Sequence, residues 1–495
     1  MKKYIKYLML GMLIFSVSCS DFLDKNPLDR ITSQTFWKNE SEAAMGLAGV
    51  YSRLLVTTFR HNDGRFDTMA GECCMNQSQG CIAIAQGNIE PHSGDHIANT
   101  YNECYAGIAA CNFFLDNIDK APVADVTLNR YKGEVRFLRA FFYSILVDHY
   151  GGVPLYTSSV TIDEAKVKQS PKSEVLTQIY ADLDFAIANL PNTGYTDGHA
   201  VKGTAQALKA RVLLYNSDWQ AAADMANQVI QSGNFSLAEN FRTLFLASGQ
   251  TNNPEIMFST RHVSPDILTD VDVRWAWHAI LNPRQELVDA YECTDGLSIK
   301  QSPLYDPDNW LKNRDPRLAL TIKRFEENAI NSAGQEVTFA YNGISGTGFN
   351  PVKYCNWDVL PIDYSTISEQ DWILIRYADV LLMYAEAKNE ASGPDADVYA
   401  AINQVRARAS MPALPDGLSK EQMRERIRNE RRVELALEGL RWSDILRWKT
   451  AETYIPTLVD PGGAVRRFDA SKHYLMPFPQ TEIDRNPQLV QNPNY

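Results

Sequence analysis

The sequence lacks the local motifs by which many enzymes are recognised. It contains no GxSxG nucleophile elbow, no phosphate-binding loop and no dinucleotide-binding glycine pattern. The glycine-rich stretch Gly343–Gly348 reads GISGTG, which has the wrong spacing for a nucleophile elbow. Carboxylates are plentiful, and a glycosidase needs only two of them ~5 to 9 Å apart. We therefore predict no catalytic residue, and an all-helical glycoside hydrolase remains a remote alternative.

Positive charge is also in short supply. The formal net charge is −12 and the isoelectric point is near 5.3. Nucleic-acid binding draws its affinity from many contacts between Lys or Arg and phosphate. This balance of charge argues against a nucleic-acid partner.

Metal-binding motifs are absent as well. There is no CxxC and no HExxH, so we predict no metal site, although His92 and His96 lie four residues apart near several cysteines. We expect no cofactor. Structural calcium stays open, because two acidic pairs carry the oxygen ligands that calcium prefers but neither begins a complete calcium loop: Asp306 with Asp308, and Asp395 with Asp397.

No hydrophobic run is long enough to cross a membrane. The run from Tyr7 to Val17 has about 11 residues, whereas a membrane span needs ~20. Three lysines precede it and small residues lead from it to Cys19, a pattern typical of a signal peptide. A cysteine in this position resembles a bacterial lipobox, although Ser16 stands where leucine is usual. We predict a signal peptide over 1–18 and lipidation of Cys19, with an ordinary secreted protein as the alternative.

Seven further cysteines are present, five of them between positions 73 and 111. An oxidising periplasm can pair cysteines, and the odd number leaves at least one unpaired. Cys104 and Cys111 are ~10 Å apart along a probable helix, too far for a disulfide. We predict that Cys73 or Cys74 pairs with Cys81 or with a helix cysteine. The complete pairing stays open among Cys73, Cys74, Cys81, Cys104, Cys111, Cys293 and Cys355.

Helical periodicity covers most of the chain. Asn39 and Glu42 resemble a capping box at the start of a helix. Residues 203–233 contain two short amphipathic helices joined by a tight turn and closed by Gly233, similar to a tetratricopeptide hairpin. We predict a helical region over 40–240, an irregular region over 241–370 and a second helical region over 371–495. Short strands are expected in the irregular region, as at Glu255–Thr260 and Leu318–Phe325. Residues 19–39 form the lipidated amino-terminal segment.

The last long helix, predicted over 420–449, is rich in arginine. Acidic residues are interleaved with the arginines at i, i+3 and i, i+4, as in Glu421–Arg424 and Arg426–Glu430. Such spacing is typical of a solvated helix face on which charges pair with each other. It does not indicate a nucleic-acid-binding arm.

Several long segments are very similar to the SusD/RagB family of Bacteroidetes lipoproteins. In chain order they are Cys19–Asp24 (CSDFLD), Glu134–Pro154 (EVRFLRAFFYSILVDHYGGVP), Arg376–Asn389 (RYADVLLMYAEAKN), Asn429–Trp448 (NERRVELALEGLRWSDILRW) and Tyr474–Tyr495 (YLMPFPQTEIDRNPQLVQNPNY). Asp21 and Asp24 match acids that the family associates with export to the cell surface. The resemblance spans essentially the whole chain.

This resemblance implies an all-α-dominated fold, an α/α superhelix of tetratricopeptide-like hairpins with loop-rich segments packed against it. It also implies a lipid-anchored protein of the outer membrane that faces the cell surface. Such a protein binds a glycan and works with a SusC-like TonB-dependent transporter. RagB-type members bind peptides instead, so a peptide ligand is the alternative within the family.

Aromatic residues outside the helical pattern are the candidates for sugar binding, because sugars pack their C–H faces on aromatic rings. Trp275 and Trp277 are two residues apart, so in an extended segment they would point the same way and form a platform. The competing interpretation buries both. Family members bring ligand residues from two loop regions, here about 63–101 and 265–310. These regions add the candidates Asn76, Gln79 and Tyr101. Trp310 is added as a tryptophan of the irregular region, and Tyr341 as an aromatic residue of the glycine-rich stretch Tyr341–Asn350.

Overall fold

The computed structural model describes residues 36–60, 64–76 and 79–495, without the side chains of Gln79, Asp95 and His96. The predicted signal peptide and the lipidation site Cys19 lie outside these residues. The described chain is helix-rich with few short strands, as predicted. No helix in these ranges is both long and apolar enough to span a membrane.

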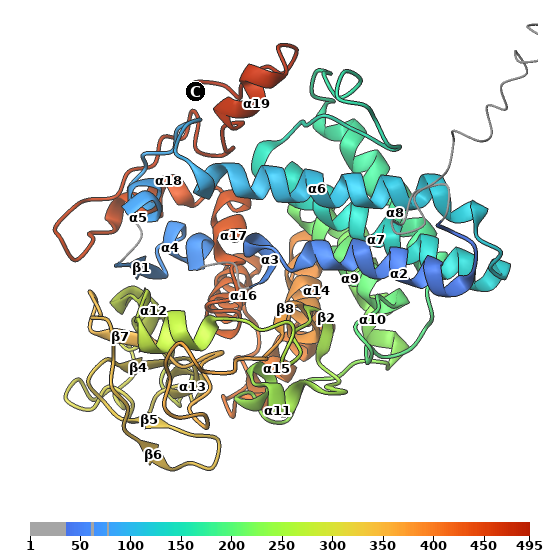
Figure 1. Cartoon of the computed structure of the whole chain (residues 1–495). Helices are drawn as coiled ribbons and strands as arrows, with labels where there is room; N and C mark the ends of the chain where they lie inside the picture. The colour runs from blue at the N-terminus through green and yellow to red at the C-terminus, as the bar shows by residue number, and fades with distance from the viewer. Residues whose placement is uncertain (1–35, 61–63, 77–78) are drawn as a thin grey trace, which may run out of the picture.

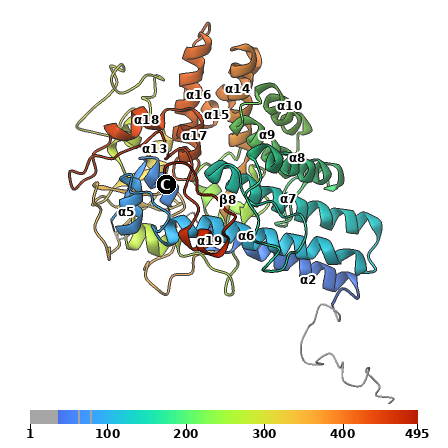
Figure 2. The ribbon, with the colours of Figure 1, turned by 90° about the horizontal axis from the view of Figure 1, so that it is seen from above.

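The helices pack in chain order into a curved layer. Helix α6 contacts α7, α7 contacts α8, and the series continues through α9 and α10 to α14, which also packs on α15 and α16. Figure 2 shows this arc, with the short strands and loops on the other side. The helices before residue 240 are α2 (Glu40–Tyr51), α3 (Thr57–Arg60), α4 (Arg65–Met69), α5 (Gln79–Ala85), α6 (Asp95–Asn117), α7 (Asp125–Tyr150), α8 (Lys172–Asn189), α9 (Lys202–Tyr215) and α10 (Trp219–Ser232).

Local signals in the sequence set the ends of several helices. The Asn39 side chain accepts a hydrogen bond from the Glu42 N–H at 2.9 Å, which confirms the predicted cap of α2. Gly233 follows α10 with a φ of 67°, a left-handed conformation that glycine adopts without strain. The predicted hairpin over 203–233 is confirmed as α9 and α10, whose facing alanines are buried.

The segment between α10 and α14 carries short elements. Four antiparallel two-stranded sheets pair β1 with β3, β2 with β8, β4 with β7 and β5 with β6. The strand predicted over 255–260 is confirmed as β2, whereas the one predicted over 318–325 is wrong in its first half, where α13 forms. Strand β1 (Cys73–Met75) comes from earlier in the chain. The elements of this segment include α11 (Ala247–Gln250), β2 (Ile256–Thr260), the π-helix η6 (Asp272–Trp277), β3 (Leu281–Pro283), α12 (Gln285–Ala290), α13 (Arg317–Thr321), β4 (Ile322–Arg324), β5 (Ala329–Ile330), β6 (Glu336–Val337), β7 (Phe349–Pro351) and β8 (Trp372–Arg376).

The single helix predicted over 420–449 is wrong, because two helices occupy this range. Helix α16 stops at Glu434, and Leu437 and Gly439 adopt φ values of 62° and 78° before α17 begins. The Lys353 ammonium donates to the carbonyls of Glu434 and Ala436, two acceptors that a continuing helix would need. The remaining helices are α14 (Tyr377–Ser392), α15 (Ala396–Arg408), α16 (Lys420–Glu434), α17 (Arg441–Arg447), α18 (Ala451–Tyr454) and α19 (Gln480–Arg485).

The seven cysteines beyond Cys19 are buried thiols, so the predicted pairing of Cys73 or Cys74 with Cys81 or a helix cysteine is wrong in this structure. Each thiol lies in packed surroundings, as is usual for this small hydrophobic side chain. Burial raises the pKa of the Cys73 thiol, which disfavours the reactive thiolate.

Candidate ligand-binding site

Strand pairing joins the two loop regions from which ligand residues are expected. Strand β1 pairs with β3 so that Met75 faces Leu281. One residue further, the Asn76 N–H donates to the Ile280 carbonyl at 3.3 Å. Asn76 therefore lies close in space to the segment that carries Trp277.

The predicted Trp275–Trp277 platform is wrong, because this segment is not extended. It forms the π-helix η6, in which the His278 N–H donates to the Val273 carbonyl five residues earlier. Two residues along a helical turn do not share a face. Trp275 points inward and packs edge-on against Trp372 at 5.7 Å between ring centroids. Trp277 is half-buried and reaches the outer side of the turn.

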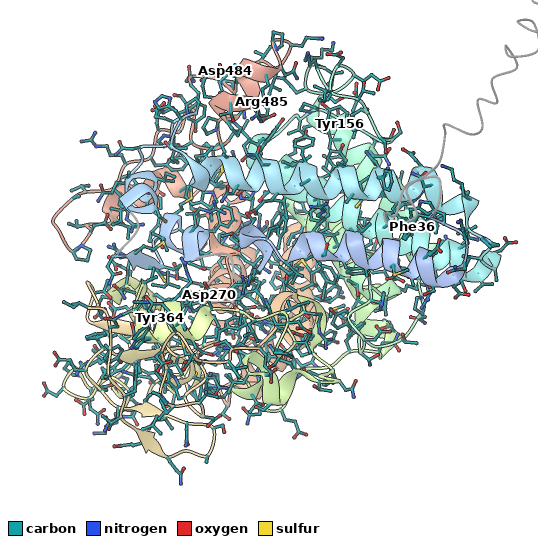
Figure 3. All side chains as sticks on the ribbon, in the orientation of Figure 1. Phe36, Tyr156, Asp270, Tyr364, Asp484 and Arg485 are labelled. Carbon is teal, nitrogen blue, oxygen red and sulfur yellow. The ribbon has the colours of Figure 1, made fainter. Side chains whose placement is uncertain are left out.

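Trp277 belongs to a group of three rings that we call the aromatic patch: Trp277, His278 and Tyr364. The Trp277 and Tyr364 rings are 4.9 Å apart and perpendicular, and the Trp277 and His278 rings are 4.7 Å apart. Tyr364 is 78% exposed, so the patch faces solvent. Figure 3 labels Tyr364 among the loop-rich segments, beneath the first helices in that view.

A glycine-rich loop over residues 341–348 fixes the outer edge of the patch. The Asn342 N–H donates to the Trp277 carbonyl at 2.9 Å. A Cβ atom at Gly343 would lie 1.9 Å from the His278 carbonyl oxygen, so only glycine fits there. The Asn76 amide donates to the carbonyl of Ile344, whose own side chain is exposed. Asn76 and Trp277 are thus held by the same loop.

The same loop borders a cleft of about 260 Å³ through Gly346. Asn76, Gln86 and Asp460 line it, and the Asn76 Oδ1 atom has no hydrogen-bond partner among the described residues. Burial opposes ionisation of Asp460, but Arg466 at 2.8 Å, Gln86 and Arg284 together outweigh it and lower the pKa of this carboxyl. The cleft therefore offers a sugar both an amide and an ionised carboxylate.

No ring contact joins Tyr101, Trp310 or Tyr341 to the aromatic patch. Tyr101 on α6 is buried, 4.6 Å from Tyr105 and 5.8 Å from Phe478 between ring centroids. Trp310 is buried and donates through Nε1 to Glu327. The Tyr341 hydroxyl accepts from Lys323 at 2.8 Å, and its ring packs on Phe325 and Phe339. The Gln79 side chain lies outside the described part of the chain.

Tyr364 and His278 were not predicted from the sequence. The Asp363 carboxylate accepts from the Ser365 N–H at 2.7 Å, so Tyr364 occupies the tip of an Asx turn. An Asp-x-Ser sequence after a proline is a signal for such a turn, and an aromatic ring at its centre is directed toward solvent. That signal could have identified Tyr364.

No group of three His, Cys, Asp or Glu side chains within the described residues is arranged to hold a metal ion. Three of the four acids considered for calcium have protein partners. Asp306 contacts Lys312 at 3.1 Å, and Lys388 contacts Asp395 at 3.0 Å as well as Asp397. Asp395 also caps α15.

Two family models match the chain. The model described as "SusD family" matches residues 274–495, and the model described as "Starch-binding associating with outer membrane" matches residues 21–214. The first match contains η6 from Arg274 onward, the 341–348 loop and Tyr364. The second contains β1 and Asn76. The candidate site is therefore built from both matched parts.

Among curated proteins, the chain is similar to the SusD-like protein P2 of Formosa agariphila, with 27% identity over 521 residues and full coverage of both chains. Among solved structures, it is similar to a SusD-like carbohydrate-binding protein of Bacteroides fragilis, with 27% identity, a TM-score of 0.81, and coverage of 92% of this chain and 100% of that one. A laminarin-binding SusD-like protein has 27% identity, a TM-score of 0.72, and coverage of 93% and 100%.

Proposed function

Because this chain is a SusD-like family protein, we propose that it binds an oligo- or polysaccharide at the cell surface and delivers it to a SusC-like TonB-dependent transporter. The observation that carries the proposal is the solvent-facing aromatic patch, whose loop also borders a polar cleft. Proteins of similar sequence and fold are described as binding carbohydrate, starch or laminarin.

The chemistry of the patch supports a sugar ligand. A pyranose presents C–H groups on its faces and hydroxyl groups around its edge. Trp277 and Tyr364 offer ring surface for the C–H groups, and Asn76 and Asp460 offer acceptors for the hydroxyls. A chain of sugars could therefore stack on the patch and extend one residue into the cleft.

The remaining parts of the proposal concern attachment and partner. Lipidation at Cys19 would join the protein to the outer membrane, where several acyl chains on one residue make a durable anchor. Capture near the membrane then supplies the transporter with ligand that is already bound. The proposal requires binding without cleavage, in agreement with the lack of a catalytic motif in the sequence.

The test uses residues 20–495, expressed without the lipid and titrated calorimetrically with soluble starch, laminarin and a peptide digest. We expect saturable glycan binding that Trp277→Ala or Tyr364→Ala weakens about tenfold or more, since a central aromatic contact contributes ~2 kcal/mol. Phe113→Ala is the matched control, because Phe113 is an exposed ring on α6 outside the patch.

Each mixture is also assayed for new reducing ends. Binding to peptides alone would replace the glycan by a peptide ligand of the RagB type. Release of reducing ends would indicate a hydrolase. Equal binding by the Tyr364→Ala and Phe113→Ala variants would exclude the aromatic patch as the site.

A further inference from the structure

Three arginines on α16 and α17 form a basic cluster outside the candidate site. Arg428 and Arg432 are four residues apart on α16, so they share one face of this helix. Arg441 belongs to α17, which lies close to α16 near the centre of Figure 1. None of the three arginines lines the cleft or belongs to the aromatic patch. The cluster is therefore a separate feature of the molecule.

Two aromatic rings join these arginines. The guanidinium carbons of Arg428 and Arg441 lie 4.7 and 5.3 Å from the centroid of the Trp448 ring. Those of Arg432 and Arg441 lie 5.7 and 5.9 Å from the centroid of the Tyr454 ring. Arg441 therefore packs against both rings and shares one ring with each arginine of α16. We call these five residues the arginine cluster.

Arg441 is mostly buried, yet its guanidinium lacks a hydrogen-bonded partner. Its side chain keeps 16% of its surface exposed, and its Nε atom lies 3.7 Å from Glu72, which is longer than a hydrogen bond. No residue in the described part of the chain accepts a hydrogen bond from it. The Nε atom is enclosed, whereas the two terminal nitrogens reach solvent. The N–H groups on these two nitrogens are therefore open to a ligand.

The carboxylates near the cluster do not balance its positive charge. Glu72 is buried, and Arg432 donates to both of its oxygens at 3.0 and 3.2 Å, so Arg441 shares a carboxylate that is already paired. Glu425 contacts Arg428 at 3.4 Å, but its side chain is 72% exposed, where an ion pair contributes little. Burial and then Arg432 lower the pKa of Arg441, in agreement with an excess of positive charge.

We propose that the arginine cluster binds an oxoanion, namely a sulfate or phosphate group, through the terminal nitrogens of Arg441. A guanidinium presents parallel N–H donors that match two oxygens of such a group, and a tetrahedral anion has further oxygens for a second arginine. The protein as a whole carries a net charge of −12 and repels anions, so saturable anion binding requires a local site. The group can belong to a free ion or to a sugar ester. The site does not depend on glycan binding at the aromatic patch.

The test titrates residues 20–495 separately with inorganic phosphate, inorganic sulfate and glucose 6-phosphate. Ionic strength is held constant with sodium chloride, because screening alone changes the attraction between charges. We expect saturable binding of at least one of the three. Tighter binding of the sugar phosphate than of inorganic phosphate identifies a sugar ester as the ligand, and the reverse order identifies the free ion.

Variants of Arg441 test the proposed contact. Arg441→Gln, which removes the open donors and the charge, should weaken anion binding about tenfold. Arg441→Lys keeps the charge but loses the planar pair of donors, so it should weaken binding less than Arg441→Gln. Arg485→Gln is the matched control, because it removes the same charge from α19, where Arg485 contacts Glu482 at 2.8 Å.

Thermal unfolding verifies that each variant folds. If Arg441→Gln does not fold, wild-type protein is treated with phenylglyoxal, an arginine reagent, and bound anion should protect Arg441 but not Arg485 in the mass spectrum. Anion binding that survives Trp277→Ala and weakens in Arg441→Gln supports the proposal. It is overturned if none of the three anions binds, if Arg441→Gln and Arg485→Gln bind equally, if Trp277→Ala abolishes binding, or if Arg441 is not protected.

Discussion

At the scale of single residues, His199 ties a loop to the helical layer through a buried carboxylate. His199 Nδ1 lies 2.6 Å from Glu134 Oε2 on α7, and the Tyr51 hydroxyl donates to the same oxygen at 2.7 Å. The Ala200 N–H in turn donates to Tyr51 at 2.8 Å. The residues just before α9 are thereby held against α2 and α7.

This contact predicts a pH dependence of stability. The hydrogen bond to Glu134 raises the pKa of His199, with Asp197 adding to the shift while partial burial and Arg130 oppose it. A raised folded-state pKa gives stability that is fully present below the unfolded-state value, ~6.5, and is lost as pH rises through the folded-state value. The difference in melting temperature between wild type and His199→Gln should therefore be largest near pH 6 and shrink toward pH 8.5.

Thermal unfolding in steps of pH measures this difference. His92→Gln serves as the control, because His92 is exposed at the surface. Parallel curves for wild type and His199→Gln across this range would contradict the prediction.

The site residues also show what residue-scale reasoning can predict. Asn76 and Trp277 could be chosen as candidates because each lies in a segment without helical periodicity and has a side chain suited to sugar binding. Trp275 and Trp310 have the same residue type and similar surroundings in sequence, but both are buried. Whether a loop aromatic points inward depends on partners such as Trp372 and Phe349, which are distant in sequence and invisible to local patterns.

At the scale of elements, the sequence predicts a helix correctly where residues at its own ends, such as a cap or a glycine, set its limits. The α9–α10 hairpin follows from its periodicity and Gly233. The break between α16 and α17 does not, because Leu437 in a left-handed conformation is unusual and is stabilised by Lys353 and Arg376 from elsewhere. The π-helix η6 likewise has no signal in its own sequence.

At the same scale, the loop over residues 341–348 predicts how one glycine substitution affects stability and glycan binding. Gly343→Ala places a methyl group against the His278 carbonyl, so the loop must move away from the aromatic patch. We expect this overpacking to lower the free energy of unfolding by ~1–3 kcal/mol. Glycan affinity should fall with it, since Asn342 and Ile344 no longer hold Trp277 and Asn76.

Gly346→Ala is the matched control in the same loop, because its nearest contact is at an ordinary 3.8 Å. Urea denaturation measures both variants, and the starch and laminarin titrations compare Gly343→Ala with wild type. An equal loss of stability in the two variants would mean that the Gly343 contact does not position the loop.

At the scale of the whole molecule, a buried charge network joins regions far apart in the sequence. Glu434 on α16 is fully buried and accepts from Arg376 on β8 at 2.6 Å, from Arg317 on α13 at 2.8 Å, and from Arg408 on α15. Arg376 also contacts Glu255 at 2.7 Å, next to β2. The helical layer and the loop-rich region are thus held together at one carboxylate.

The sequence predicted that the arginines of residues 420–449 lie on a solvated or mutually paired helix face, and for most of them the predicted partners are wrong. Among the described residues, Arg428 keeps its helical partner Glu425 at 3.4 Å. Arg424 instead contacts Glu390 at 2.6 Å, and Arg426 contacts Glu292 at 2.8 Å. Spacing along a helix cannot distinguish pairing within it from pairing with other elements.

Glu434→Gln therefore leaves several buried guanidinium groups without their shared carboxylate, which should cost ~3–5 kcal/mol of unfolding free energy. Burial alone would raise the pKa of Glu434, but Arg408, Arg376 and Arg317 outweigh it and hold the pKa well below its usual value. A lowered folded-state pKa gives stability that is present above ~4.5 and is lost as pH falls through the folded-state value. Between pH 7 and pH 3, the free energy of unfolding should thus decrease less in Glu434→Gln than in wild type.

The control is Glu425→Gln, at an exposed pair, whose free energy of unfolding should stay within ~0.5 kcal/mol of wild type at every pH. If the two variants are equally stable at pH 7, the charge at Glu434 does not hold the two regions together.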